Sequence, residues 1–162
     1  MIPTIGESFA RDVSRMQGAR DRGDAISLML MHRWIIKKYS CHISPKAQID
    51  PSVSFPHPTG IVIGDGVIIG EDCTVYQHVT MGRLQKDAAE YPVLEKGCVV
   101  YAGSCVLGDA HLGPGTVVGA NAVVLGGSYG PGSTLAGLPA KSVRRGVLLI
   151  EGACPACLAV AA

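Results

Sequence analysis

The sequence predicts an all-β solenoid in which each six-residue repeat forms one flat side of a coil. An aliphatic residue recurs at every sixth position between residues 94 and 125, and the residue four places later is small. The aliphatic positions are Leu94, Val100, Val106, Leu112, Val118 and Val124, and the small ones are Cys98, Ser104, Ala110, Thr116 and Ala122. A period of six fits neither the helical period of 3.6 nor the simple strand period of 2. We therefore expect the aliphatic side chains to fill a narrow core.

The same period runs through two upstream blocks, which carry the solenoid back to about residue 41. The aliphatic or aromatic positions of these blocks are Ile43, Ile49 and Phe55, followed by Ile63, Ile69, Val75 and Met81. The period breaks twice, with a step of eight residues after Phe55 and a step of thirteen after Met81. Repeat proteins often carry their binding chemistry on such insertions. The two breaks are therefore the candidate functional segments.

Composition limits the function classes. Hydrophobic residues make up 48% of the 162 residues but aromatic ones only 5%, which suits a thin aliphatic core. The net charge of +1 gives no case for nucleic acid or an anionic membrane as partner. The longest apolar run is too short to span a bilayer. A secretory signal is not evident at the N-terminus, and the six cysteines are dispersed, so we expect a reduced, cytoplasmic protein.

Residues 1–40 are predicted to be helical. Thr4 and Glu7 have the spacing of a capping box at the start of a first helix. Asp24 is the expected N-cap of a second helix that ends near Ser40, with Lys37 and Lys38 in its last turn. We expect the apolar face of this second helix to pack on the first coil or on a neighbouring subunit.

The first break contains a histidine between two prolines, His57, in the segment from Phe55 to Gly60. Flanking prolines stiffen the backbone, and an insertion projects away from regular packing. Imidazole titrates near neutral pH and can accept a hydroxyl proton. His57 is therefore the candidate general base.

The second break, residues 82–93, is polar and charged, as is typical of a loop that forms the wall of a site. It supplies Arg83, Glu90 and Tyr91 as candidate acceptor-binding residues, and we add His78, which lies just before it. His111 also occupies an outward position and is interpreted as a surface residue.

After Leu125 the repeat decays, and residues 134–141 are expected to close the coil. The tail from residue 146 ends in small apolar residues and contains Cys154 and Cys157, which we interpret as part of a frayed segment rather than a redox or metal site. The predicted organisation is therefore a helical segment at 1–40, a solenoid at 41–145 and a tail at 146–162.

Three motifs resemble a known family. They are residues 55–65 (FPHPTGIVIGD), residues 77–82 (QHVTMG) and residues 136–141 (AGLPAK). Together they are similar to the serine O-acetyltransferase branch of the hexapeptide-repeat acyltransferases, which fold as left-handed parallel β-helices. The resemblance implies an acetyl-CoA-dependent O-acetyltransferase, active as a homotrimer, in which His57 removes the proton of the acceptor hydroxyl.

The resemblance also suggests where acetyl-CoA would lie. Small residues along the coils would let its pantetheine arm approach the backbone closely, and basic residues near the end would meet its phosphates. The candidate cofactor-binding residues are Ala102, Gly103, Ala120, Gly137 and Lys141, with Arg144 and Arg145 nearby. No metal is expected.

Several positions depart from the pattern of the serine enzymes. Where those enzymes have an Asp that pairs with the catalytic His, fifteen residues upstream, this chain has His42. We retain His42 as a second catalytic candidate, useful only as a neutral hydrogen-bond partner of His57. Pro56 stands in place of an Asp, and Glu90-Tyr91 in place of Arg-His. The terminal Ile that engages cysteine synthase is also absent, so we expect no binding of that enzyme.

These departures lead to a sugar or polysaccharide precursor as the preferred acceptor, with serine as the alternative. Two other classes stay open. One is a metal-dependent β-helix hydratase that uses some of His42, His57, His78 and His111, and the other is a non-catalytic scaffold. A trimer is also expected on physical grounds, because a thin coil with flat faces favours side-by-side packing in a closed ring.

Overall fold

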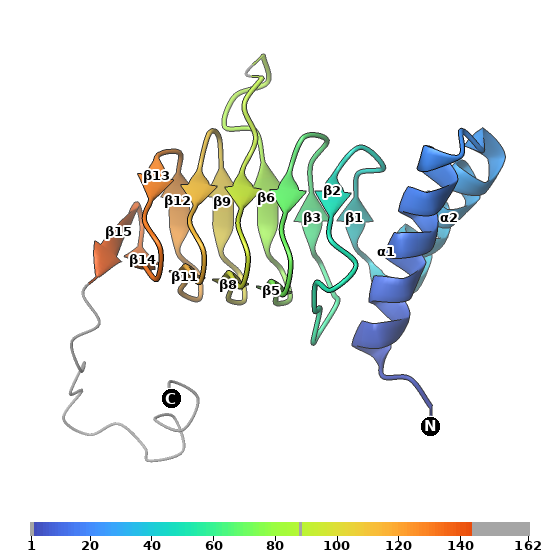
Figure 1. The fold of residues 1–162 in the computed structure, drawn as a ribbon, viewed down its shortest axis with the longest axis horizontal. Helices are drawn as coiled ribbons and strands as arrows, with labels where there is room; N and C mark the ends of the chain where they lie inside the picture. Colours follow the sequence, from blue (N-terminus) through green and yellow to red (C-terminus); the bar gives the residue numbers. More distant parts are fainter. Residues whose placement is uncertain (1, 88, 144–162) are drawn as a thin grey trace.

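The computed structural model describes residues 2–87 and 89–143, and it shows a parallel β-solenoid with two helices at its N-terminal end (Figure 1). The predicted fold class is therefore confirmed. The helices are α1 (Ile5–Asp21) and α2 (Ala25–Tyr39), and the first strand begins at His42. The tail cysteines, Arg144 and Arg145 lie outside the described residues. No helix in the described ranges is long and apolar enough to cross a membrane.

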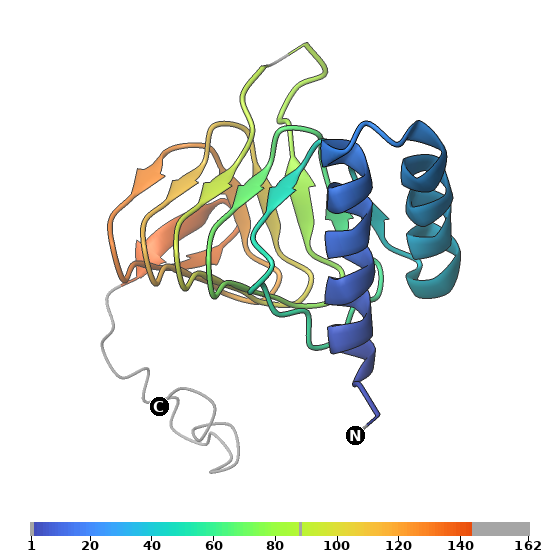
Figure 2. The same ribbon diagram turned by 45° about the vertical axis from the view of Figure 1, so that its right-hand side comes forward.

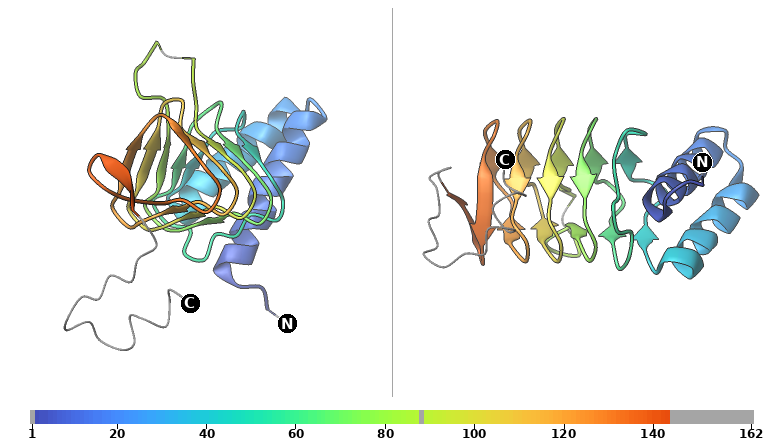
Figure 3. Two further views of the ribbon diagram at one scale, coloured as in Figure 1. Left: turned by 60° about the vertical axis from the view of Figure 1, so that its left-hand side comes forward. Right: turned by 90° about the horizontal axis from the view of Figure 1, so that it is seen from below.

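The strands are short and form three five-stranded sheets around a common core (Figure 3). Sheet A contains β1 (His42–Ile43), β3 (Val62–Ile63), β6 (Thr80–Gly82), β9 (Cys105–Leu107) and β12 (Val123–Leu125). Sheet B contains β2 (Gln48–Ile49), β4 (Ile68–Ile69), β7 (Val93–Leu94), β10 (His111–Leu112) and β13 (Ser128–Tyr129). Sheet C contains β5 (Thr74–Val75), β8 (Val99–Val100), β11 (Val117–Val118), β14 (Thr134–Gly137) and β15 (Ala140–Val143).

The core consists of the periodic residues that the sequence places inward. All six aliphatic positions between Leu94 and Val124 are at most 1% exposed. Cys73 and Cys98 are also buried, as their small inward positions predict. Each parallel pair joins equivalent repeat positions of neighbouring coils, for example Val75 with Val100 and Val100 with Val118. The six-residue period is therefore the coil geometry itself.

Both helices begin at the predicted caps. The Thr4 hydroxyl accepts a hydrogen bond from the Glu7 N–H (3.2 Å), and the Glu7 carboxylate accepts one from the Thr4 N–H (2.7 Å). Asp24 caps α2 by accepting from the Ser27 N–H (3.0 Å). The helix ends at Tyr39 because Ser40 adopts a left-handed conformation with φ of 53°.

Helix α1 covers the open end of the solenoid (Figure 2). The Gln17 side-chain amide donates to the Ile49 carbonyl (2.8 Å) and accepts from the Ile49 N–H (3.0 Å). Arg20 donates to the carbonyls of Pro45 and Ala47. Strand β2 is at the edge of sheet B, so these contacts satisfy backbone groups that would otherwise be available to another strand.

The other end of the solenoid closes differently from a coil. Strand β15 folds back and pairs antiparallel with β14, joining Leu135 to Ser142 and Ala136 to Lys141. Residues 134–141 therefore close the coil as expected, but they do so as a hairpin. The six-residue period carries no signal for this antiparallel strand.

Asp12 ties α1 to α2 from a buried position. Its carboxylate accepts hydrogen bonds from the Tyr39 hydroxyl (2.9 Å), the Trp34 indole N–H (3.2 Å) and the Lys38 ammonium (3.2 Å). Burial raises the pKa of Asp12, but these hydrogen bonds and the Lys38 charge outweigh it, so the pKa lies below its usual value. The ionised carboxylate is therefore part of what fixes the helix pair.

We expect Asp12→Ala to lower the free energy of unfolding at pH 7 by about 1–3 kcal/mol, because it leaves the buried Tyr39 hydroxyl without its acceptor and removes the contacts with Trp34 and Lys38. The lowered pKa of Asp12 stabilises the fold above the usual carboxyl pKa, and this contribution is lost as the pH falls through the lower folded-state pKa. The deficit should therefore shrink toward about pH 3. Urea unfolding at both pH values measures it, with Asp87→Ala, at an exposed site, as the control. An equal deficit at both pH values would contradict the assignment.

Candidate active site

The corner between sheets C and A brings together most of the residues predicted to bind or react. Successive coils cross this corner at Gly60, His78, Gly103 and Asn121, whose φ angles lie between 56° and 71°. Backbone hydrogen bonds link the corners in a column, from His78 N–H to the Thr59 carbonyl and from Gly103 N–H to the Gln77 carbonyl. We call this column the C–A corner, and the first break in the period lies at its N-terminal end.

His57 is held out from the coil at this corner. The insertion from Phe55 to Ile61 leaves the edge of the solenoid between β2 and β3 (Figure 1). Phe55 and Pro58 are buried, whereas His57 is exposed. The Thr59 N–H donates to the His57 carbonyl (2.8 Å), which tightens the turn. The imidazole is therefore accessible to solutes on a segment whose neighbours are fixed.

His78, predicted as an acceptor-binding residue because it lies just before the second break, is found beside the His57 segment of the first break. Its ring packs directly on Gly60, so closely that a Cβ on Gly60 would collide with the ring. Gly60 has a φ of 65°, which only glycine adopts without strain. The structure thus places His78 against the insertion that carries His57.

His42 does not pair with His57 in the chain as described. It lies in β1, where its ring makes an edge contact with His32 of α2 at a centroid distance of 5.2 Å. Burial and the neighbouring His42 lower the pKa of His32. Neither a hydrogen bond nor a ring contact joins His42 to His57 among the described residues. Because His42 faces the helix, its expected partnership with His57 is not seen.

Four of the predicted cofactor-binding residues follow the C–A corner away from His57. Ala102 and Gly103 lie on the coil of β8, Ala120 follows β11, and Gly137 ends β14. Ala120 and Gly137 are exposed, and the other two are half-buried. The fifth residue, Lys141, is exposed in β15 near the end of the solenoid. The corner is therefore a strip of accessible backbone.

Gln77 adds an unsatisfied acceptor to the same corner. Its side-chain carbonyl oxygen is buried and has no hydrogen-bond partner in the described part of the chain. A buried acceptor without a partner costs free energy. An N–H donor from a bound molecule would relieve that cost, and pantetheine carries two amide N–H groups.

The loop from residue 83 to residue 92 joins β6 to β7 at the corner between sheets A and B (Figures 1 and 2). This corner and the C–A corner lie at opposite ends of the strands of sheet A. The Tyr91 ring covers Gly66 and lies under the Arg83 guanidinium, 5.6 Å from its centroid. Glu90 is exposed. One chain therefore does not bring Arg83, Glu90 or Tyr91 to His57, and Tyr91 packs on the preceding coil of its own chain.

His111 is far from this corner in the topology. It lies in β10 of sheet B and pairs with Glu95. Within the described ranges, three or more His, Cys, Asp or Glu side chains do not gather as a metal site would require. Of the histidines considered for a metal site, His57 and His78 share the C–A corner, whereas His42 and His111 lie on β1 and β10.

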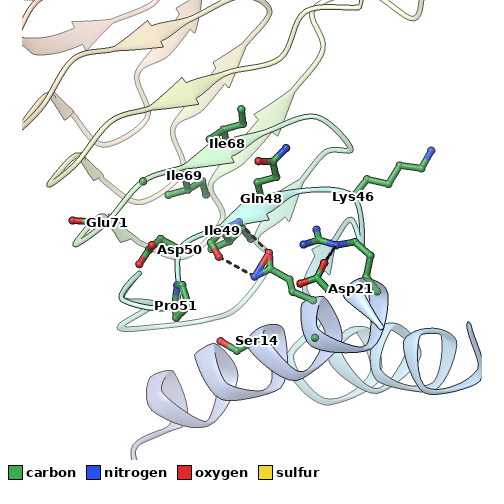
Figure 4. Close-up of a pocket in the computed structure, with 14 residues that line it drawn as sticks. Ser14, Asp21, Lys46, Gln48, Ile49, Asp50, Pro51, Ile68, Ile69 and Glu71 are labelled. Atoms are coloured by element: carbon green, nitrogen blue, oxygen red, sulfur yellow. Dashed lines mark hydrogen bonds and ion pairs between the residues drawn. The ribbon is translucent and has the colours of Figure 1, made fainter. Parts of the chain in front are cut away.

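A cavity between α1 and sheet B contains none of the predicted site residues. It is lined by Ser14 and Gln17 of the helix and by Gln48, Ile68 and Glu71 among others (Figure 4). Several of its polar side chains already have partners, as in the Gln17 contacts with Ile49 and the Glu71 contact with Lys96. This cavity and the candidate site residues at the C–A corner are therefore in different parts of the molecule.

Sequence reasoning missed two aromatic residues at the C–A corner. The Tyr76 ring approaches His57 at 6.4 Å and stacks on Tyr101 at 5.1 Å with an interplanar angle of 16°. Tyr76 and Tyr101 each follow the aliphatic residue of a repeat, one coil apart. Counting the repeats would have placed them side by side.

Comparisons with known proteins find similar sequences and similar solved structures. The chain is 38% identical over 121 residues to serine acetyltransferase from Buchnera aphidicola (from Acyrthosiphon pisum), covering 74% of this chain and 43% of that enzyme. A serine acetyltransferase in complex with CoA matches with a TM-score of 0.76 and 27% identity, covering 83% of this chain and 55% of the other. Soybean serine acetyltransferase complexed with serine matches at 0.75 and 29%, covering 83% and 56%.

No protein-family model matches the chain. The chain spans less than half the length of the curated relatives it matches first.

We expect Gly60→Ala to destabilise the fold by about 1–3 kcal/mol. The alanine has to adopt a φ of 65°, which is strained for a residue with a Cβ, and the Cβ displaces the His78 ring. Gly82→Ala is the matched control, since open space surrounds its Cβ position. Urea unfolding of both variants measures the difference. Equal stability of the two variants would contradict the close packing of His78 on the insertion.

Proposed function

We propose that this chain, whose solenoid belongs to the serine O-acetyltransferase branch of the hexapeptide-repeat acyltransferases, transfers an acetyl group from acetyl-CoA to a hydroxyl group. The observation that carries the proposal is the position of His57. It is an accessible imidazole on a stiff insertion, at the start of a strip of small residues and exposed backbone. The relatives reported above are serine acetyltransferases, and one was solved with CoA.

The reaction needs a base, because a neutral alcohol is a weak nucleophile. His57 accepts the hydroxyl proton while the oxygen attacks the thioester carbonyl. The tetrahedral intermediate then collapses, the C–S bond breaks, and the CoA thiolate recovers the proton from the imidazolium. Backbone N–H groups along a coil corner are suitable donors to the oxyanion.

The donor fits the C–A corner. An extended pantetheine arm can follow Ala102, Gly103 and Ala120, where short side chains leave the backbone open. The unsatisfied Gln77 oxygen offers an acceptor for one of its amides. Lys141 lies near the end of the strip, where it can meet a phosphate.

Serine is the acceptor that the comparisons favour, and the preference for a sugar finds no support in them. The prediction of a sugar acceptor depends partly on Glu90 and Tyr91, which stand in place of the Arg-His pair of the serine enzymes. Tyr91, however, packs beneath Arg83 on Gly66 of the preceding coil of its own chain. We therefore propose serine O-acetylation as the first activity to test.

We also propose a homotrimer with sites between chains. His57 and the loop at residues 83–92 lie at opposite ends of the strands of sheet A. A loop can therefore form the wall only of a site that contains the His57 of another copy. A closed ring lets every loop reach a neighbouring C–A corner. Three equivalent sites result.

We expect His57→Ala to lose acetyl transfer by about a hundredfold or more, in line with removal of a general base. Release of the CoA thiol measures the rate with serine and with a panel of sugars, and serine should be turned over fastest. His111→Ala, on sheet B, is the control for loss of an exposed histidine. Undiminished turnover by His57→Ala would overturn the base assignment, and faster turnover of a sugar would restore the earlier acceptor preference.

Mixed assemblies test the shared site. We expect a His57→Ala chain and a chain with residues 84–90 replaced by a short glycine linker each to be inactive alone. Co-expressed, they should regain activity, because one interface pairs an intact His57 with an intact loop. Sedimentation equilibrium should show three chains. Failure to regain activity in verified mixed trimers would contradict a site shared between chains.

A further inference from the structure

Among the described residues, the imidazole of His57 forms a ring pair with Tyr76. The His57 and Tyr76 ring centroids are 6.4 Å apart with an interplanar angle of 49°. This lies within the range in which aromatic rings attract one another. No ion pair or hydrogen bond joins His57 to a carboxylate in residues 2–87 and 89–143. His42, at the position where an acid was expected, contacts His32 instead.

Tyr76 is itself held by a second ring. Tyr76 and Tyr101 stack at 5.1 Å, close to the spacing of about 4.8 Å between neighbouring strands. Their backbones are locked in register, because Val75 pairs with Val100 and the Tyr76 N–H donates to the Val100 carbonyl (3.0 Å). Both side chains are half-buried. The stack therefore has a fixed direction along the solenoid axis.

The stack is confined to the two coils next to the His57 insertion. Val100 pairs with Val118, and Val118 with Leu135, so the next members of this column are Gly119 and Ala136. These positions have little or no side chain to continue the stack. The two rings thus lie at the His57 end of the corner, and small residues occupy the equivalent positions of the next two coils.

We propose that Tyr76, backed by Tyr101, is the positioning residue for His57. This inference rests on the proposed function, in which His57 must keep its imidazole aimed at the acceptor hydroxyl. A general base is usually oriented by a third group, often a carboxylate. Here the ring of Tyr76, tilted against the imidazole at a centroid distance of 6.4 Å, restricts its orientation from one side.

The first test is independent of any activity. In protein labelled with 13C-histidine, the Cε1–H resonance of His57 is identified by its loss in His57→Ala. We expect Tyr76→Leu to shift this resonance by removing the ring current, and Tyr76→Phe to leave it in place. Tyr129→Leu is the control for loss of a half-buried tyrosine, because Tyr129 lies at another corner and bonds the Gly126 carbonyl. An unchanged His57 resonance in Tyr76→Leu would overturn the proposal.

The second test separates positioning from binding. Tyr76→Leu should lower kcat by about three- to tenfold while leaving the KM for acetyl-CoA within about twofold, and Tyr76→Phe should restore kcat. Tyr101→Leu should have a smaller effect, and the double variant should be no worse than Tyr76→Leu alone, because the two rings act as one unit. A kcat for Tyr76→Leu equal to that of the unchanged protein would refute the positioning role.

The two tests also distinguish this inference from the proposed function. If the unchanged protein transfers no acetyl group, the proposed function fails, and the His57 resonance still decides whether Tyr76 holds the imidazole. If His57→Ala loses activity but Tyr76→Leu changes neither the resonance nor kcat, the base assignment stands and Tyr76 is not its positioning residue.

Discussion

The parallel backbone ladder between successive coils is the constraint on which the rest of the structure depends. Each strand donates to and accepts from the equivalent strand of the next coil, as Val99–Val100 does with Val117–Val118. Equivalent residues must therefore stack in columns at a strand spacing of about 4.8 Å. Residues that do not fit a repeat can be accommodated only at a corner. The same rule produces the aliphatic core, the column of left-handed corner residues and the two projecting segments.

The ladder also leaves two open ends, which close by different means. Helix α1 satisfies the first edge with side chains, most directly through the Gln17 amide on Ile49. The last coil ends in an antiparallel hairpin, where β15 pairs with β14. Helix α1 thereby occupies backbone groups at the β2 edge, whereas β15 covers β14 and is itself the edge strand of sheet C. The solenoid can then associate through its sides, as the proposed trimer requires.

The core and the helix starts could be predicted because they depend on short-range spacing. The inward aliphatic residues, the capping box at Thr4 and the Asp24 cap all follow from local rules. The hairpin at β15 could not, because its pairing has no periodic signal. The placement of His57 at a corner followed from counting repeats, and the same count would have paired Tyr76 with Tyr101.

Side-chain partners were less predictable than positions. The sequence predicts that Tyr91 binds an acceptor, but its ring covers Gly66. Gly66 lies 25 positions earlier in the chain and has no side chain that would signal this contact. The sequence also suggests His42 as a hydrogen-bond partner of His57, but the packing of α2 on the first coil places His32 against His42 instead. Both outcomes depend on how the loop and the helix dock, which a six-residue period does not encode.

The proposed reaction connects these observations. His57 and the charged loop at residues 83–92 lie at opposite ends of the strands of sheet A, so they cannot act together within one chain. A site that uses both has to be assembled between chains. Within each chain the base then needs orientation that does not depend on the neighbour. The Tyr76–Tyr101 stack can supply it, because both rings are fixed by the same ladder that carries the corner. In this arrangement the ladder sets the direction of His57 and its distance from the donor strip, while the neighbouring loop determines which hydroxyl reaches it.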